Sequence, residues 1–179
     1  MLTNVEKLFQ NILKPADQSL LEEKGIKMKK QIMGYKRNPH LLYRLDHESI
    51  CDLFPLLNND VKHLKKMCDY VLFLAHESKL YIFLIEMKQG KDGKAKQLDA
   101  GEAFIRFVIE SAERVGLSFG DEKNIIIKKV GVTGNNTKGT TKRRPAACRT
   151  LSDSYYPKTT YIACAGGSQV ILREWVEAV

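Results

Sequence analysis

The chain has 179 residues, of which 44% are apolar and 28% charged, and it carries a net charge of +8. This length and composition suit one globular domain with a buried core and exclude an intrinsically disordered chain. No segment approaches the roughly 18 consecutive apolar residues of a membrane span, and residues 1–15 lack the basic start and apolar core of an export signal. We therefore expect a cytoplasmic protein without membrane contact, folded as a single domain over residues 1–179.

The first 65 residues predict a mainly helical N-terminal part. The segments VEKLFQNILK (5–14) and HESICDLFPLLNNDVKHLKK (47–66) space their apolar residues as amphipathic helices do, the second with a break at Pro55. The segment NPHLLYRL (38–45) is predicted to be a loop or short turn. Residues 24–44 contain lysines and arginines but no acid, which indicates either a solvated surface or a polyanionic partner. The second interpretation predicts nucleic-acid contacts by Lys29, Lys30, Lys36 and Arg37.

Residues 69–88 predict a β-hairpin. The segments DYVLFLA (69–75) and KLYIFLIEMK (79–88) are rich in β-branched and aromatic residues, and a short polar segment joins them. A turn centred on Glu77 and Ser78 places Asp69 opposite Glu86 in the antiparallel pair. Directly opposed Cβ atoms lie about 4.5 to 5.5 Å apart, and Lys88 projects from the same face as Glu86.

The carboxylates of Asp69 and Glu86 repel each other at that distance, so a proton or a cation has to neutralise one of them. The Lys88 ammonium alone could do so, which would make the group a salt-bridged cluster at the rim of the sheet. A hard divalent cation is the alternative, since Mg²⁺ takes one or two protein carboxylates and keeps several waters. The main-chain carbonyl of Met87 could supply a further oxygen ligand. This alternative predicts metal-assisted phosphodiester hydrolysis.

The remainder of the chain alternates helix and strand. Residues 97–115 predict a helix because apolar residues recur along one face, and NIIIKKVGVT (124–133) and TTYIACA (159–165) predict strands. The segment SQVILREWVEA (168–178) is typical of either a helix or a strand. Together these elements predict an α/β fold with a mixed central sheet flanked by helices, and with its core in residues 66–165.

The segment GNNTKGTTKRRP (134–145) predicts a long polar loop. Gly134 and Gly139 have the spacing of the first half of a P-loop, but Thr140 stands where the lysine must be, so we expect no nucleotide cofactor. Residues 123–150 contain no acid, and a basic loop of this kind can follow a nucleic-acid backbone. The predicted contacts are Lys138, Lys142, Arg143 and Arg144.

The four cysteines, Cys51, Cys68, Cys148 and Cys164, lie far apart in the sequence and form no C-x-x-C pair. That spacing argues against a zinc site and offers no disulfide framework. We expect buried or inert thiols.

Asp69, the hairpin, the segment IEMK that contains Glu86 and Lys88, and a helix that opens at Gln97 together resemble the PD-(D/E)xK nuclease family. The resemblance covers about residues 45–165. It departs from the family pattern at Cys68, which stands at the proline position, and at Gly101, which stands where one branch has tyrosine in Gln-x-x-x-Tyr. The resemblance implies a restriction-endonuclease-like core that cuts DNA, or sometimes RNA, with Mg²⁺ or Mn²⁺.

The resemblance also implies roles for individual residues. Asp69 and Glu86 would be metal ligands, and Lys88 would position or activate the attacking water. Gln97 would face the metal site, or else be a solvated residue of the first helical turn. An acid on the preceding helix often completes such a site, and Glu48 is the candidate, with Asp46, Asp52 and Asp60 as competitors.

We therefore expect a metal-dependent nuclease with DNA favoured over RNA. Small nucleases of this family often act beside a partner protein or as homodimers, in bacterial restriction, antiphage defence or mobile elements. The alternatives are a catalytically inactive module of the same fold that binds nucleic acid or a partner protein, and a basic α/β domain without a nuclease role.

Overall fold

The structure is a computed structural model of the chain. It describes residues 1–9, 13–14, 17–25, 28–34, 38–46, 57–58, 60–61, 64–88, 95–134, 147–152, 160–165 and 169–178.

The N-terminal part contains more strand than helix, which corrects the prediction for residues 1–65. After helix α1 (Leu2–Leu8) come strands β1 (Leu20–Glu23), β2 (Met28–Met33) and β3 (His40–Arg44). Burial alternates along β2, with Met28, Lys30 and Ile32 turned inward, as in a strand with one covered face. Strand β3 occupies the segment that was expected to be a loop or turn. The second expected helix, 47–66, lies largely outside the described residues.

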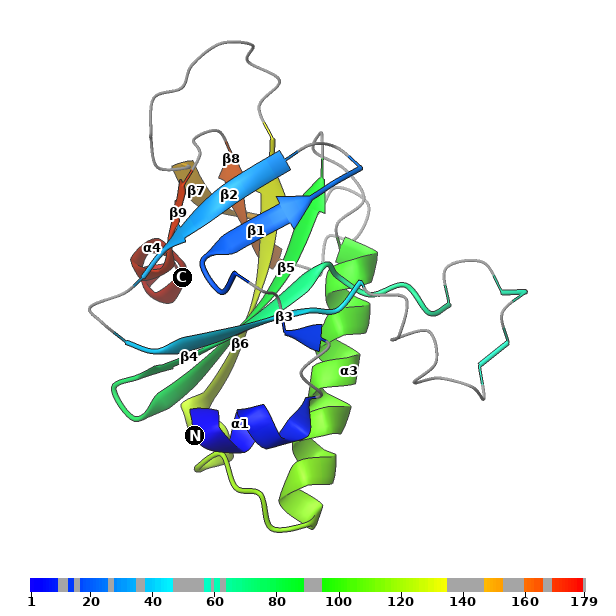
Figure 1. Cartoon of the computed structure of the whole chain (residues 1–179), viewed down its shortest axis with the longest axis vertical. Coiled ribbons are helices and arrows are strands. Elements are labelled where there is room, and N and C mark those ends of the chain that lie inside the picture. The colour runs from blue at the N-terminus through cyan, green and yellow to red at the C-terminus, as the bar shows by residue number, and fades with distance from the viewer. Residues whose placement is uncertain are drawn as a thin grey trace.

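Two sheets form the centre of the molecule (Figure 1). A six-stranded sheet has the order β3-β4-β5-β6-β8-β7, and a three-stranded sheet has the order β1-β2-β9. Strands β5, β6 and β8 are parallel, whereas β3, β4 and β7 each pair antiparallel with a neighbour. The further strands are β4 (Tyr70–His76), β5 (Lys79–Lys88), β6 (Ile125–Thr133), β7 (Ala147–Ser152), β8 (Thr160–Ala165) and β9 (Gln169–Ile171). The architecture is α/β with mixed sheets, as expected.

The hairpin of β4 and β5 has the predicted register. His76 pairs with Lys79 next to the turn, and Tyr70 pairs with Ile85 at the far end. The turn residues Glu77 and Ser78 have φ values of 48° and 60°. Positive φ at both central residues belongs to the two-residue turn whose twist matches that of paired strands.

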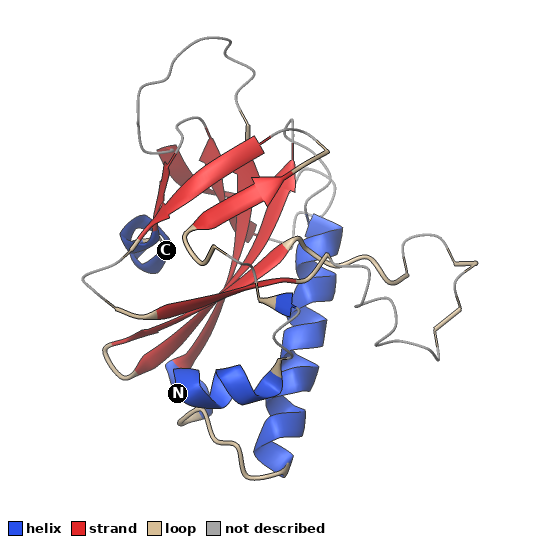
Figure 2. Ribbon diagram, in the orientation of Figure 1, coloured by secondary structure: helices blue, strands red, loops and turns tan. Residues whose placement is uncertain are grey.

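The six-stranded sheet is covered on both faces. Helix α1 and the long helix α3 (Ala95–Arg114) pack on one face, against residues such as Val71, Ile82 and Leu84. The β1-β2-β9 sheet and helix α4 (Leu172–Glu177) pack on the other face, and Figure 2 shows β1 and β2 lying across the longer strands. A short 3-10 helix, η2 (Glu122–Asn124), precedes β6. None of the helices in the described ranges is long and apolar enough to span a membrane.

Helix α3 approaches the sheet closely at Gly101. A Cβ atom at this position would lie 2.5 Å from the Cys68 sulfur and 3.6 Å from a methyl group of Leu84. Glycine is therefore what allows the helix to pack at this height above the strands that carry the expected site.

The C-terminal third differs from the predictions in two respects. Strand β7 follows the predicted polar loop 134–145 and was not foreseen. Residues 169–177, which were typical of either helix or strand, form β9 and then α4. Cys148 of β7 stands directly opposite Cys164 of β8, and the two form a disulfide. The expectation of free thiols is therefore wrong for this pair, because sheet pairing brings together two cysteines that are distant in sequence. Cys68 is a free, buried thiol.

Candidate active site

Asp69 is positioned by two neighbouring segments at the point where the chain enters β4. Its main-chain carbonyl accepts hydrogen bonds from the N–H groups of Leu45 (2.8 Å) and Asp46 (3.3 Å), which follow β3. Its side-chain Oδ2 accepts a hydrogen bond of 2.5 Å from the N–H of Met87 in β5. Asp69 thus joins the end of β3 to the end of β5, and it is only 7% exposed.

Glu86 lies on β5, one residue beyond the Tyr70–Ile85 pair that ends the β4–β5 ladder. Extending that register by one residue places it opposite Asp69. Glu86 is 3% exposed. Its Oε1 atom lies 3.1 Å from the Nζ atom of Lys88, whereas its Oε2 atom is buried and has no hydrogen-bond partner among the described residues. A buried carboxylate oxygen without a donor is unfavourable. This atom is therefore the part of the site that most needs a ligand.

The electrostatics of Asp69 and Glu86 favour their neutral forms. Burial raises the pKa of Asp69 to about 7, and the carboxylates of Glu23 and Asp46 act in the same direction, against the hydrogen bond from Met87. Burial raises the pKa of Glu86 to about 8, the charge of Asp69 adds to this, and Lys88 opposes it. Near neutral pH the pair therefore holds protons until a cation replaces them.

Two charged residues near the buried pair are themselves exposed to solvent. Lys88 has 30% of its side chain exposed, and Asp46 is exposed. Both residues act electrostatically on Asp69 and on Glu86, so both lie near the acids.

Asp46, whose N–H donates a hydrogen bond to the Asp69 carbonyl, is the described acid whose charge acts on both members of the pair. Glu48 and Asp52 lie outside the described residues, and Asp60 is exposed and does not figure among the charges that shift the pair. Glu23, at the end of β1, was missed by the sequence analysis because its segment was expected to be helical. Its approach to Asp69 depends on how the second sheet packs, and no local pattern signals that.

Gln97 lies in the first turn of α3 and is half-buried. It precedes Gly101, which packs on Leu84, by one helical turn. Because α3 connects the parallel strands β5 and β6, it runs in the direction opposite to β5. The start of α3, which carries Gln97, is therefore placed over the end of β5 that carries Glu86. That Gln97 faces the site, rather than being a solvated first-turn residue, stays a prediction.

The residues fit a hard divalent cation in donor chemistry. Two carboxylates that act on each other electrostatically lie at one end of the sheet, and one buried oxygen of Glu86 lacks a partner within the described ranges. Mg²⁺ and Mn²⁺ prefer such oxygen ligands and can be bound by one or two carboxylates. The residues that would hold the cation are Asp69 and Glu86, with the Met87 carbonyl as the further predicted ligand. The part of the chain that is described contains no cluster of three or more His, Cys, Asp or Glu residues arranged to hold a metal.

The basic residues are divided between surface and interior. Lys29 is on the surface, with its side chain 65% exposed and an ion pair of 2.8 Å to Glu22. Lys30 is 3% exposed, because the covered face of β2 carries it. The expected phosphate contact by Lys30 is corrected accordingly. The other predicted contacts, Lys36, Arg37, Lys138, Lys142, Arg143 and Arg144, lie outside the described residues.

Two lysines of the basic segment 123–150 have structural partners. Lys128 donates hydrogen bonds to the main-chain oxygens of Trp175, Val176 and Ala178, at 2.6 to 3.2 Å. Lys129 forms ion pairs with Asp99 (2.6 Å) and Glu102 (2.8 Å) of α3. Lys128 thus holds α4 against the sheet, and Lys129 holds α3. Because both lysines have partners within the protein, fewer lysines of this segment are available to a polyanion than the sequence suggests.

Comparison with known proteins assigns no relative to this chain: no protein-family model, curated protein or solved structure matches it.

Proposed function

We propose that this protein is a metal-dependent nuclease that hydrolyses phosphodiester bonds, with DNA as the preferred substrate, in agreement with the resemblance of its motif to the PD-(D/E)xK family. The observation that supports this most is the pairing of two buried carboxylates, Asp69 and Glu86, beside the Lys88 ammonium. One Glu86 oxygen has no partner in the part of the chain that the structure describes, and the Nζ atom of Lys88 lies 3.1 Å from the other. Burial raises the pKa values of both acids, and raised carboxyl pKa values are a frequent property of catalytic sites.

The two carboxylates bind the cation in this proposal, and the burial that raises their pKa values makes that binding dependent on pH. A bound Mg²⁺ ion supplies positive charge that offsets the charge developing on the scissile phosphate. Lys88 orients the attacking water and stabilises the developing negative charge through its ammonium. Gln97 contributes an amide from the first turn of α3 to the same end of the sheet. Asp46 adds negative charge near the pair and strengthens cation binding.

The net charge of +8 supports a polyanionic substrate. Within the described residues, Lys29 and Arg149 provide exposed cations. Phosphate contacts of this type hold nucleic acid without regard to sequence. A cytoplasmic enzyme that acts with a partner protein or as a homodimer is consistent with this proposal.

The test is a cleavage assay with the full chain on labelled single- and double-stranded DNA and RNA, in Mg²⁺, Mn²⁺ or EDTA. Cleavage is expected only with the divalent cations. Lys88→Ala and Glu86→Gln are expected to reduce the rate about 10²- to 10⁴-fold while binding of the substrate is retained. Lys79→Ala, at the opposite end of the same strand, is the matched control and should cut normally.

Two results would contradict the proposal. Cleavage that persists in EDTA, or that Lys88→Ala leaves intact, would show that the acid pair is not the catalytic centre. Salt-sensitive binding without cleavage in any metal would identify the protein as a binding module of this fold instead.

A further inference from the structure

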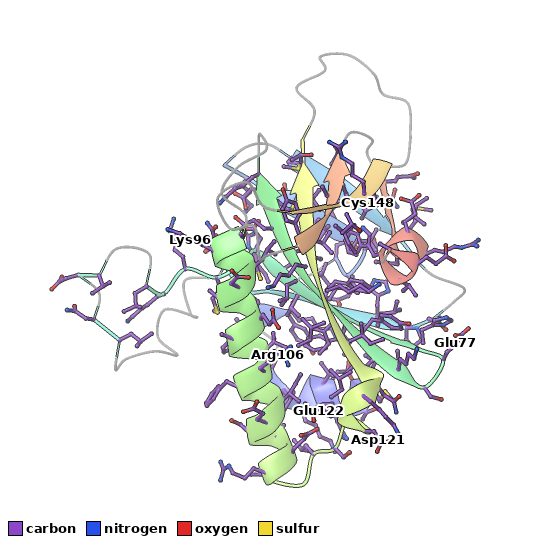
Figure 3. All side chains as sticks on the ribbon, turned by 180° about the vertical axis from the view of Figure 1, so that it is seen from behind. Glu77, Lys96, Arg106, Asp121, Glu122 and Cys148 are labelled. Carbon is purple, nitrogen blue, oxygen red and sulfur yellow. A yellow bond between two sulfur atoms is a disulfide. The ribbon has the colours of Figure 1, made fainter. Side chains whose placement is uncertain are left out.

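The disulfide between Cys148 and Cys164 joins the edge strand β7 to its neighbour β8. Strand β7, which carries Cys148, is an edge strand that pairs with β8 alone. Cys164 of β8 is in register with Val132 of β6, which is in register with Met87 of β5. The disulfide therefore lies level with the acid pair. In Figure 3, Cys148 lies at the same end of the molecule as Lys96 at the start of α3, and Glu77 and Asp121 lie at the other end.

The residue after Cys148 connects this strand to the proposed site. Arg149 pairs with Ala163, Ala163 with Gly131, and Gly131 with Glu86. These four residues form one row across the sheet, so that Arg149 and Glu86 share a face. Three strand spacings of about 4.8 Å separate them by about 14 Å. Arg149 is exposed and can contact a phosphate several nucleotides away from the one at Glu86.

The two sulfurs differ in access. Cys164 is fully buried, whereas Cys148 is half-buried and precedes the exposed residues Arg149 and Thr150. Cys148 is therefore the more accessible residue of the pair, and the expected site of attack by a thiolate is its sulfur. The electron pair of the broken bond would then move to Cys164. The indole N–H of Trp175 donates a hydrogen bond of 3.1 Å to the Cys164 sulfur. A donor at this atom stabilises the departing thiolate, and a stabilised leaving thiolate accelerates exchange.

We propose that the Cys148–Cys164 disulfide is a redox switch, opened by a dithiol reductant, that controls how firmly β7 presents Arg149 to nucleic acid. The control of substrate binding rests on the proposed nuclease function, whereas the opening of β7 does not. One thiolate of the reductant attacks Cys148, forms a mixed disulfide and releases Cys164 as a thiolate. The second thiolate of the reductant then displaces Cys148. The protein gains two electrons and two protons, and the reductant becomes a disulfide.

The switch is tested first without reference to activity. The full chain is treated with dithiothreitol or, as a control, with its oxidised form, and is not denatured. Reduction is expected to make residues 148 and 164 reactive to iodoacetamide and to change the emission of Trp175, the single tryptophan. It should also raise tryptic cleavage after Arg149 at least about tenfold, because opening of the strand governs cleavage. Cleavage after the exposed Lys123, at the other end of the sheet, should not change.

The second test concerns the substrate. Reduction should raise KM for a long oligonucleotide and leave kcat unchanged, and it should lower the dependence of log KM on log salt by about one unit. Cys148→Ser should behave as the reduced protein in either redox state. Arg149→Gln should weaken binding in the oxidised protein and abolish the effect of reduction on KM, while the Trp175 response persists.

The outcomes separate the two proposals. A disulfide that resists dithiothreitol until the protein is denatured would overturn the switch. Reduction that opens β7 without changing KM would overturn its role in binding. Absence of cleavage in both redox states would overturn the nuclease function, while the alkylation and proteolysis results would still decide whether β7 opens.

Discussion

Replacement of Glu86 by glutamine gives a direct test of the electrostatics of the site. Glutamine keeps the size of the side chain and cannot ionise. A carboxyl group whose pKa is raised on folding binds its proton more tightly in the folded chain. Its contribution to stability is therefore present below the unfolded pKa and is lost as the pH rises through the folded pKa. For Glu86 this loss of stability extends over the pH range from the ordinary glutamate pKa of 4.5 to the raised pKa of about 8.

The magnitude follows from these two values. One pKa unit corresponds to about 1.36 kcal/mol, so ionisation of Glu86 at pH 8 opposes folding by at most about 4 kcal/mol. Relaxation of the site and entry of water reduce such penalties. We therefore take about half of the upper limit of about 4 kcal/mol. The variant Glu86→Gln is then expected to match the wild type at pH 5 and to be about 2 kcal/mol more stable at pH 8.

The assay is urea unfolding of both proteins between pH 5 and pH 8 in EDTA, repeated with Mg²⁺. Added Mg²⁺ should stabilise the wild type at pH 8, where the acids can ionise, and should have little effect on Glu86→Gln. Glu113→Gln, at an exposed position of α3, is the matched control and should follow the wild type. A stability difference between wild type and Glu86→Gln that stays constant from pH 5 to pH 8 would refute the reasoning.

Three further substitutions test the surroundings of the site. Gly101→Ala should destabilise the protein by about 1 to 3 kcal/mol through overpacking, because its Cβ would meet the Cys68 sulfur. Urea unfolding should show partial recovery of stability when Cys68→Ala is added. Unchanged stability of the single variant, which replaces glycine by a better helix former, would contradict the close approach. Lys128→Met should lower the free energy of unfolding by about 1 to 3 kcal/mol, since carbonyls at the end of α4 lose their donor; unchanged stability would show that the contact contributes nothing. Asp46→Asn should weaken Mg²⁺ binding about tenfold in calorimetry, with Asp60→Asn as the control, and equal affinities would remove Asp46 from the site.

The hairpin and its acid pair were predictable because their geometry is local. Strand period, turn position and antiparallel pairing determine which residues of a short hairpin face each other. The register of β4 and β5 was confirmed from the Tyr70–Ile85 pair to the His76–Lys79 pair. Extended by one residue, the same register places Asp69 opposite Glu86. The prediction of helix α3 likewise rested on periodicity within one segment, and the structure bears it out.

The errors concern segments whose conformation depends on distant partners. Residues 20–44 form strands because β1 and β2 pair with each other and with β9, and because β3 pairs with β4. Short apolar runs of this kind are ambiguous between helix and strand. Burial of Lys30 follows from the same packing, since only the second sheet covers its face.

The amino-acid sequence by itself determined an α/β protein with a hairpin that brings two acids and a lysine to one end of a strand, since these features depend on neighbours within about twenty residues. Only the tertiary structure decided that Asp46 and Glu23 lie beside that pair, that Cys148 bonds to Cys164, and that Arg149 shares a row with Glu86. In each case the two residues belong to segments that are distant in the sequence and meet only through strand pairing or sheet packing. Contacts over such separations leave no periodic signal in the sequence.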